Sequence, residues 1–179
     1  MTDQPPFHPA EIVEVLRRHD VEYVAIGAFA ALAQGAPIPA TADIDVTPRT
    51  TAKNLQRLSA ALDELEARIR TEAIPEGLPF RHDGKSLGQA QTWNLQCRHG
   101  DFDIAFRPSG TDGYDDLIRT ATIVVVDGQP TVVASIDDII RSKTAAGRLK
   151  DFAALPGLER YRDSLHRHRP EPDGPSLGL

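Results

Sequence analysis

The chain has 179 residues, a length typical of one domain, and its single Cys97 excludes an internal disulfide framework and a multi-cysteine zinc site. Its net charge of −6 argues against a protein that coats nucleic acid, and its 40% hydrophobic and 26% charged residues are ordinary for a globular protein. The longest apolar run, residues 23–33, is too short to cross a bilayer, and the first nine residues contain no secretory signal. We therefore expect one cytoplasmic domain over residues 1–169 and a disordered tail over residues 170–179.

Hydrophobic periodicity predicts alternating helices and strands in the first half of the chain. The predicted elements are a helix from Pro9, a strand over residues 21–26, a helix over residues 28–34, a strand over residues 44–46 and a helix after a Thr50 or Thr51 cap. The last of these has one apolar face, formed by Leu55, Leu58, Leu62 and Leu65.

Two hairpins and two helices are predicted for the second half, after a Gly- and Pro-rich loop over residues 72–91. The elements are strands over residues 93–98 and 102–106, strands over residues 122–126 and 131–134 around the turn Asp127-Gly128, a helix opened by a Ser135/Asp138 capping box, and a helix over residues 150–166. This order favours an α/β (mixed α+β) fold: a small mixed sheet flanked by helices, with a C-terminal helical segment from about residue 135.

The charge of the chain is distributed unevenly. Residues 141–169 carry eight Lys or Arg and three Asp or Glu, whereas residues 1–140 are strongly acidic. An acidic body is compatible with bound metal ions and a basic segment with a polyanion. On charge alone, a solvated helix face remains the simpler explanation of the basic segment.

Asp43 and Asp45 are the first candidates for chemistry. Side chains at positions i and i+2 of a strand point to the same face, so both carboxylates project together while Ile44 packs behind them. Two close carboxylates repel one another unless a cation lies between them, and Mg²⁺ prefers such oxygen ligands. Alone the pair is a weak signal, because Asp-x-Asp occurs by chance at many strand ends.

Two further features lie on either side of this pair in the sequence. Gly27-Ala28 joins a strand to a helix, where free backbone N–H groups suit a phosphate, although an ordinary turn is the simpler explanation. Asp103 alternates with Phe102 and Ile104, so its carboxylate projects from the face opposite the apolar pair and could complete a metal cluster. Asp101 fits a plain hairpin end better.

Taken together, these residues resemble the nucleotidyltransferase superfamily. The resemblance rests on Gly27-Ala28 between strand and helix, on Thr41-x-Asp43-Ile44-Asp45 and on Gly100-x-Phe102-Asp103. The later block Ser135-x-x-Asp138-x-Ile140-x-x-Lys143-x-x-x-Gly147-Arg148-x-Lys150-Asp151 is similar to the small AbiEii-type, MenT-like toxin branch. One departure is Ala28, which stands where the family has Ser or Gly and lacks the hydroxyl that touches the triphosphate.

The resemblance implies a Mg²⁺-dependent transfer of a nucleoside monophosphate from a nucleoside triphosphate (NTP) to an acceptor hydroxyl. In the toxin branch the acceptor is typically the 3′ end of tRNA, which implies a block of translation and a cognate antitoxin protein as partner. The implied metal ligands are Asp43, Asp45 and Asp103. The implied catalytic residues are Asp43, Asp45, Lys143 and Asp151, and the implied nucleotide-binding residues are Gly27, Ala28, Lys143 and Arg148.

Two other functions fit parts of the sequence. Asp43-x-Asp45-x-Thr47 matches the nucleophile loop of haloacid-dehalogenase-like phosphatases, but that loop follows a buried strand, which residues 39–42 do not resemble. A non-catalytic nucleotide- or RNA-binding module with the same fold is the other alternative, because Ala28 replaces the usual residue. The intact set of Asp43, Asp45 and Asp103 argues against it.

Overall fold

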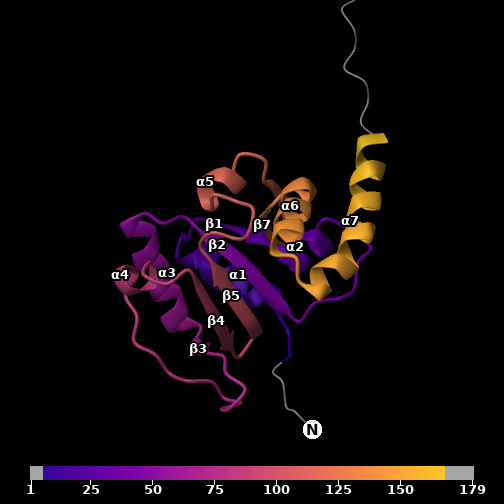
Figure 1. Ribbon diagram of the computed structural model, residues 1–179. Coiled ribbons are helices and arrows are strands. Elements are labelled where there is room, and N and C mark those ends of the chain that lie inside the picture. Colours follow the sequence, from indigo (N-terminus) through magenta and orange to yellow (C-terminus); the bar gives the residue numbers. More distant parts are fainter. Residues whose placement is uncertain (1–5, 168–179) are drawn as a thin grey trace, which may run out of the picture.

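The computed structural model describes residues 6–167, so the predicted tail over residues 170–179 lies outside the described residues. Helices and strands alternate before two hairpins and two final helices follow (Figure 1). The elements are α1 (Pro9–Arg18), β1 (Tyr23–Ile26), α2 (Gly27–Ala33), β2 (Asp43–Pro48), α3 (Ala52–Glu64), β3 (Arg68–Ile69), α4 (Gly84–Leu87), β4 (Thr92–Cys97), β5 (Gly100–Ala105), α5 (Tyr114–Leu117), β6 (Thr122–Val126), β7 (Gln129–Val133), α6 (Ile136–Ala146) and α7 (Leu149–Arg167).

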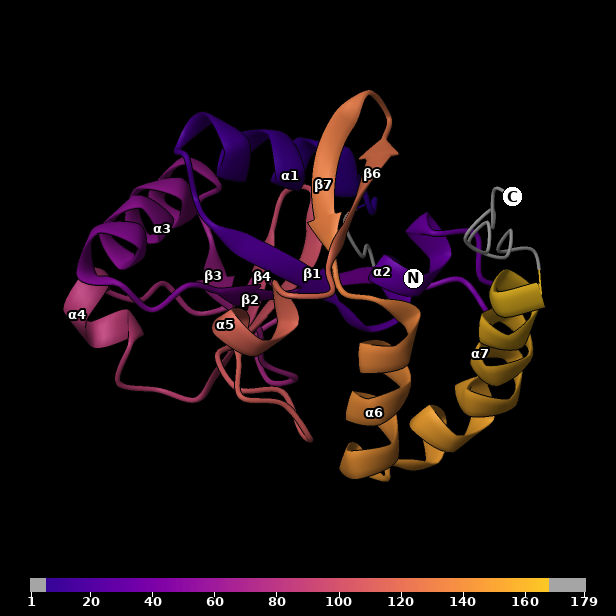
Figure 2. The same cartoon turned by 90° about the horizontal axis from the view of Figure 1, so that it is seen from above.

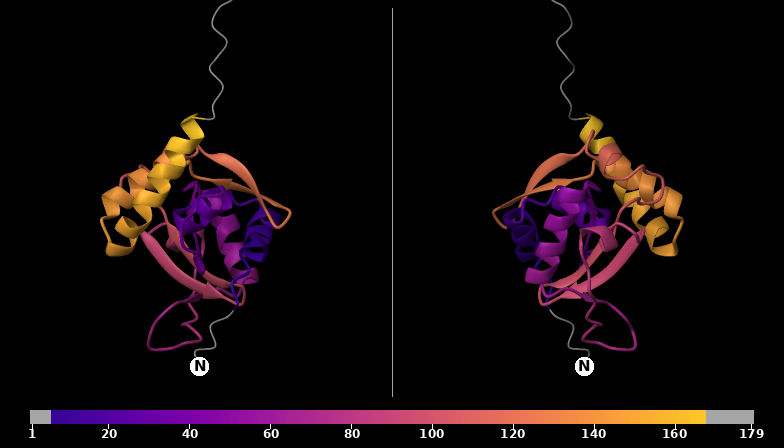
Figure 3. Two further views of the ribbon diagram at one scale, coloured as in Figure 1. Left: turned by 90° about the vertical axis from the view of Figure 1, so that its right-hand side faces the viewer. Right: turned by 90° about the vertical axis from the view of Figure 1, so that its left-hand side faces the viewer.

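The strands form one mixed sheet in the order β3-β4-β5-β2-β1-β7-β6. β2 runs antiparallel to β1 and parallel to β5, and β1 runs parallel to β7. α1 and α3 cover one face of the sheet, and α6 and α7 lie on the other side (Figures 2 and 3). This arrangement confirms the predicted mixed α/β fold with a helical C-terminal segment.

Most predicted elements are confirmed, with ends that shift by at most two residues. The leucine face of α3 is buried, and the Thr51 side chain accepts from the Asn54 N–H, as a helix cap does. Asp127 and Gly128 both have positive φ, which gives the β6–β7 hairpin the turn that matches strand twist. Among the described residues, no helix is both long enough and apolar enough to cross a membrane.

Three short elements and one cap differ from the sequence prediction. β3, α4 and α5 have only two to four residues, too few to produce a readable hydrophobic period. The Ser135 side chain caps α6 by accepting from the Asp138 N–H. The Asp138 carboxylate, however, accepts from the Ser135 hydroxyl and from Arg141, so the reciprocal half of the predicted capping box is replaced by side-chain contacts.

Candidate active site

Two parallel strands place three carboxylates side by side. In the β2–β5 ladder Asp45 stands opposite Asp103, while the intervening Ile44 and Phe102 are fully buried on the other face. Asp43 lies on the same face as Asp45, because side chains alternate along a strand. Carboxylate oxygens of Asp43, Asp45 and Asp103 all lie within 4.8 Å of one another. The structure thus brings together the three residues that the sequence suggested as metal ligands, and we call them the acidic cluster.

The acidic cluster holds more negative charge than its surroundings stabilise. Burial, and then the charges of Asp43 and Asp103, raise the pKa of Asp45 to about 7, against the weaker opposing effect of Lys150 and Lys143. Burial also raises the pKa of Asp103, although Arg70 opposes this shift. A divalent cation would relieve the repulsion, and an all-oxygen donor set fits Mg²⁺.

Gly27 lies directly against the acidic cluster. It has a φ of +71°, and a Cβ built there would lie 2.6 Å from Asp45 Oδ2. No other residue type fits both the backbone conformation and the space. Gly27 and Ala28 are the first two residues of α2, where backbone N–H groups have no acceptor within the helix, and both line the cavity beside the carboxylates.

We expect Gly27→Ala to displace the Asp45 carboxylate and to remove divalent-metal binding, measured by calorimetric titration. Gly128→Ala is the matched control, because Gly128 also has a positive φ, of +84°, but a Cβ there meets nothing within 4 Å. The backbone strain alone costs both variants about 1–2 kcal/mol of folding free energy. Metal binding that is equally intact in both variants would contradict the close approach to Asp45.

The helices α6 and α7 bring a second charged group to the site. Lys143 Nζ lies 3.0 Å from Asp151 Oδ1, and Arg148 Nε lies 2.6 Å from Asp151 Oδ2. Burial of the Asp151 carboxyl favours its neutral form, but hydrogen bonds from Arg148 and Lys143 outweigh burial and lower its pKa. The Lys143 side chain is only 12% exposed, which does not fit a solvated helix lysine, whereas the Arg148 side chain is 61% exposed.

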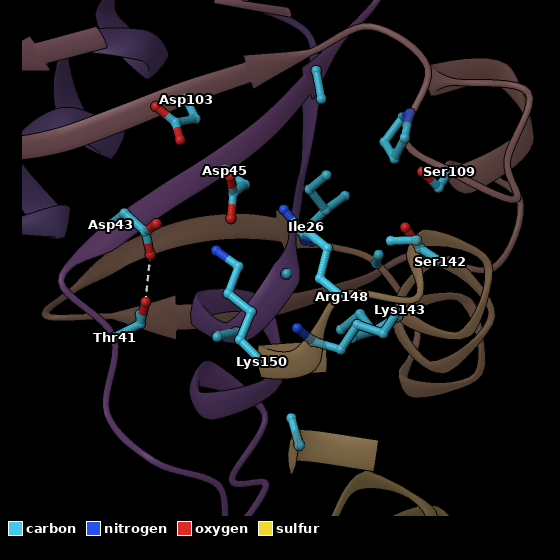
Figure 4. Close-up of a pocket in the computed structure, with 18 of the residues that line it drawn as sticks. Ile26, Thr41, Asp43, Asp45, Asp103, Ser109, Ser142, Lys143, Arg148 and Lys150 are labelled. Atoms are coloured by element: carbon cyan, nitrogen blue, oxygen red, sulfur yellow. Dashed lines mark hydrogen bonds between the residues drawn. The ribbon is translucent and has the colours of Figure 1, made fainter. Parts of the chain in front are cut away.

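A cavity of about 620 Å³ joins the two charged groups. Across it, Lys143 and Lys150 extend from the α6–α7 side toward the carboxylates of β2 and β5 (Figure 4). Asp151 is fully buried beneath Lys143 and Arg148. The suggested site residues that line the cavity are Gly27, Ala28, Asp43, Asp45, Asp103, Lys143 and Arg148.

Sequence reasoning missed the roles of Lys150 and Arg70. Lys150 stands in the motif that carried the resemblance, and its charge acts on Asp45 more strongly than that of Lys143. Arg70 donates to both carboxylate oxygens of Asp103, at 2.9 and 2.8 Å, from a segment for which no function was predicted. The hydroxyl of Thr41, a residue that also belongs to the motif, donates a hydrogen bond to the Asp43 carboxylate.

Solved structures of two nucleotidyltransferases resemble this one. A protein of Thermotoga maritima assigned to the nucleotidyltransferases matches with a TM-score of 0.50 and 16% identity, over 91% of this chain and 97% of that one. The antibiotic-resistance factor ANT(2'')-Ia matches with a TM-score of 0.54 and 14% identity, over 89% of this chain and 94% of its own. Its complex with adenylyl-2''-tobramycin matches with a TM-score of 0.55 and 14% identity, over 88% of this chain and 89% of that one.

These likenesses define the class of fold. The chain has a nucleotidyltransferase fold, as the sequence resemblance implied. No protein-family model matches the chain, and no curated protein matches it in sequence, so membership of the toxin branch stays a prediction. The fold does not support the phosphatase alternative, and Thr47, which that alternative needs in the site, is fully buried.

Proposed function

We propose that the protein transfers a nucleoside monophosphate from an NTP to an acceptor hydroxyl in a Mg²⁺-dependent reaction. The observation that carries this proposal is the acidic cluster, whose three carboxylates face Lys143 and Lys150 across one cavity of a nucleotidyltransferase fold. Oxygen ligands on one side and cations on the other suit a metal-bound triphosphate.

We assign metal binding to the carboxylates of the cavity and phosphate binding to its backbone N–H groups and cations. Asp43 and Asp45 would hold Mg²⁺, which neutralises phosphate charge and stabilises the leaving pyrophosphate when bound. Gly27 and Ala28 would donate backbone N–H groups to phosphate oxygens, and Lys143, Arg148 and Lys150 would bind them as cations.

Asp151 and Asp103 would act on either side of the triphosphate. Asp151 orients Lys143 and Arg148 from beneath the cavity, at the distances given above. Asp103 would help to hold the metal and would accept the proton of the acceptor hydroxyl, the role that the resemblance implies for the third carboxylate of the acidic cluster.

For the acceptor we propose the 3′ end of tRNA, so that the protein blocks translation as the toxin of a toxin–antitoxin pair in the cytoplasm. The supports are the toxin-type block from Ser135 to Asp151 and the basic surface of α7, where Arg160 and Arg167 are exposed. Arg162 forms ion pairs with Asp163 and Asp137, and Arg169 lies outside the described residues. A small-molecule hydroxyl is the second candidate, because the ANT(2'')-Ia complex holds an adenylylated aminoglycoside.

The deciding experiment incubates the protein with Mg²⁺, each α-labelled NTP and either total tRNA or a panel of aminoglycosides. Label in tRNA supports the toxin proposal, and label in the small molecule supports the second candidate. Label in neither, with bound NTP detected by filter retention, would favour the non-catalytic module. A chelator is the matched control, since transfer that persists without divalent metal contradicts the role of the acidic cluster.

The double variant Arg160→Glu/Arg162→Glu should weaken tRNA binding and leave NTP binding unchanged. Phosphate contacts release counterions, so losing two of them lowers the slope of log affinity against log salt by about 2. Fluorescence anisotropy across a salt series measures that slope. Arg81→Glu, a charge reversal at another exposed arginine, is the control, and an unchanged slope in the double variant would place the RNA elsewhere.

A further inference from the structure

Arg70 is held at the edge of the acidic cluster, and the proposed function gives it no task. It follows β3 directly, and its backbone N–H donates to the carbonyl of Asn94 at 2.9 Å. Its guanidinium also donates to the carbonyl of Leu95 at 3.3 Å. These contacts anchor Arg70 to β4, so the charged end is aimed at the neighbouring strand β5.

The guanidinium contacts two carboxylates of β5 at once. Nη2 donates to both oxygens of Asp103, at 2.9 and 2.8 Å, and Nη1 lies 3.0 Å from Asp101 Oδ2. Asp103 Oδ1 also accepts from the Leu95 N–H at 3.3 Å. The side chains of Asp101 and Asp103 are each 17% exposed and that of Arg70 is 29% exposed, so these ion pairs are partly shielded from water, unlike fully exposed surface pairs.

The three carboxylates of the acidic cluster therefore differ in what occupies them. Both oxygens of Asp103 already accept from a cation, whereas Asp43 accepts from the uncharged hydroxyl of Thr41. A metal ion that takes Asp103 as a ligand must compete with Arg70 for the same oxygens. Asp101, two residues away on the same face of β5, offers the guanidinium a second partner that it already contacts.

We infer that Arg70 is a positioning residue that occupies Asp103 as a counter-ion and moves onto Asp101 when a divalent metal takes Asp103 as a ligand. This inference rests on the proposed function, because it assumes that the acidic cluster binds metal. According to this inference, a metal ion binds Asp43 and Asp45 first. Asp103 becomes a ligand only when the Arg70 guanidinium leaves its oxygens. This inference also explains why Asp101, which resembles a plain hairpin-end residue in the sequence, lies beside the cluster.

The test is a titration of the full chain with Mn²⁺, used as a paramagnetic stand-in for Mg²⁺ and followed by electron paramagnetic resonance. Arg70→Ala should bind Mn²⁺ at least about tenfold more tightly, because a unit charge that competes for the Asp103 carboxylate is removed. Its metal-free thermal midpoint should fall, since the carboxylates lose their counter-ion. Arg70→Lys, which keeps the charge but not the two-oxygen contact, should bind with intermediate affinity and remains informative if the alanine variant does not fold.

The variant Asp101→Asn distinguishes movement of the Arg70 guanidinium onto Asp101 from a general effect of removing one negative charge. In the parent it should weaken Mn²⁺ binding, because Arg70 loses its second partner, and in the Arg70→Ala background the same change should have a much smaller effect. An equal effect in both backgrounds would overturn the inference. Equal Mn²⁺ affinity of the parent and Arg70→Ala would also overturn it and leave the proposed function standing, whereas no binding by any variant would reject both. Arg98→Ala, at the exposed β4–β5 turn, controls for the loss of an arginine.

Discussion

Asp45→Asn should abolish nucleotidyl transfer and, in metal-free buffer at pH 8, make the protein more stable. Transfer is lost because the amide is a poor Mg²⁺ ligand and leaves the acidic cluster incomplete. Stability rises because Asn carries no charge next to Asp43 and Asp103. The pKa of Asp45 is about 7, roughly three units above its ordinary value, and at 1.36 kcal/mol per unit the gain is at most about 4 kcal/mol.

The same shift fixes how the stability of the metal-free parent depends on pH. Between about pH 4 and pH 7 the folded protein holds a proton on Asp45 that the unfolded chain has released, so stability falls as pH rises through this window and levels off above it. Urea unfolding across this range, with chelator, measures the slope. Asp103, whose pKa burial also raises, keeps its own contribution in Asp45→Asn, so this variant should reduce the slope. Asp63→Asn, at a 75% exposed carboxylate, is the control and should keep it. A native thermal midpoint with near-normal transfer in Asp45→Asn would refute the metal assignment.

Lys143→Ala should lower transfer by about a hundredfold or more, the usual effect of removing one charged group that stabilises a transition state. It should also destabilise the protein by about 2 kcal/mol, because fully buried Asp151 loses one of its two cationic partners. Single-turnover kinetics at saturating NTP and urea unfolding measure the two effects.

Two variants separate the parts of that result. Lys53→Ala removes an exposed lysine from α3 and should change neither quantity. Arg148→Ala removes the other cationic partner of Asp151. Because the Arg148 side chain is 61% exposed, this variant should lower the transfer rate less than Lys143→Ala does. Activity of Lys143→Ala within a factor of about two of the parent, a change too small for a lost charged contact, would reject its role.

The fold could be predicted from the sequence where local chemistry is strong. The cap at Thr51, the buried face of α3 and the Asp127-Gly128 turn each depend on residues within a few positions of one another. The short β3 could not be predicted, because a strand of two residues is defined by its partner, here β4, and not by its own pattern.

The candidate site divides in the same way. Alternation along β2 and β5 places Asp43, Asp45 and Asp103 on one face, and the sequence was sufficient to suggest them. Arg70 reaches Asp103 across 33 positions of sequence, through a contact that only the packing of β3 and β4 creates. The pairing of Lys143 with buried Asp151 needed the turn at Gly147, whose φ of +64° lets α7 fold back along α6.

The pairing of β2 with β5 also determines where this chain can change in length. One residue inserted within β2 or β5 would turn the following side chains to the opposite face, placing carboxylates in the core and Ile44 or Phe102 in the cavity. The connection over residues 71–76 is largely exposed and loops away from the sheet (Figure 1), so it can lengthen without moving either strand. Length variation in proteins with this arrangement should therefore concentrate after Arg70, in a connection that does not line the cavity, where an insertion leaves the carboxylates in place.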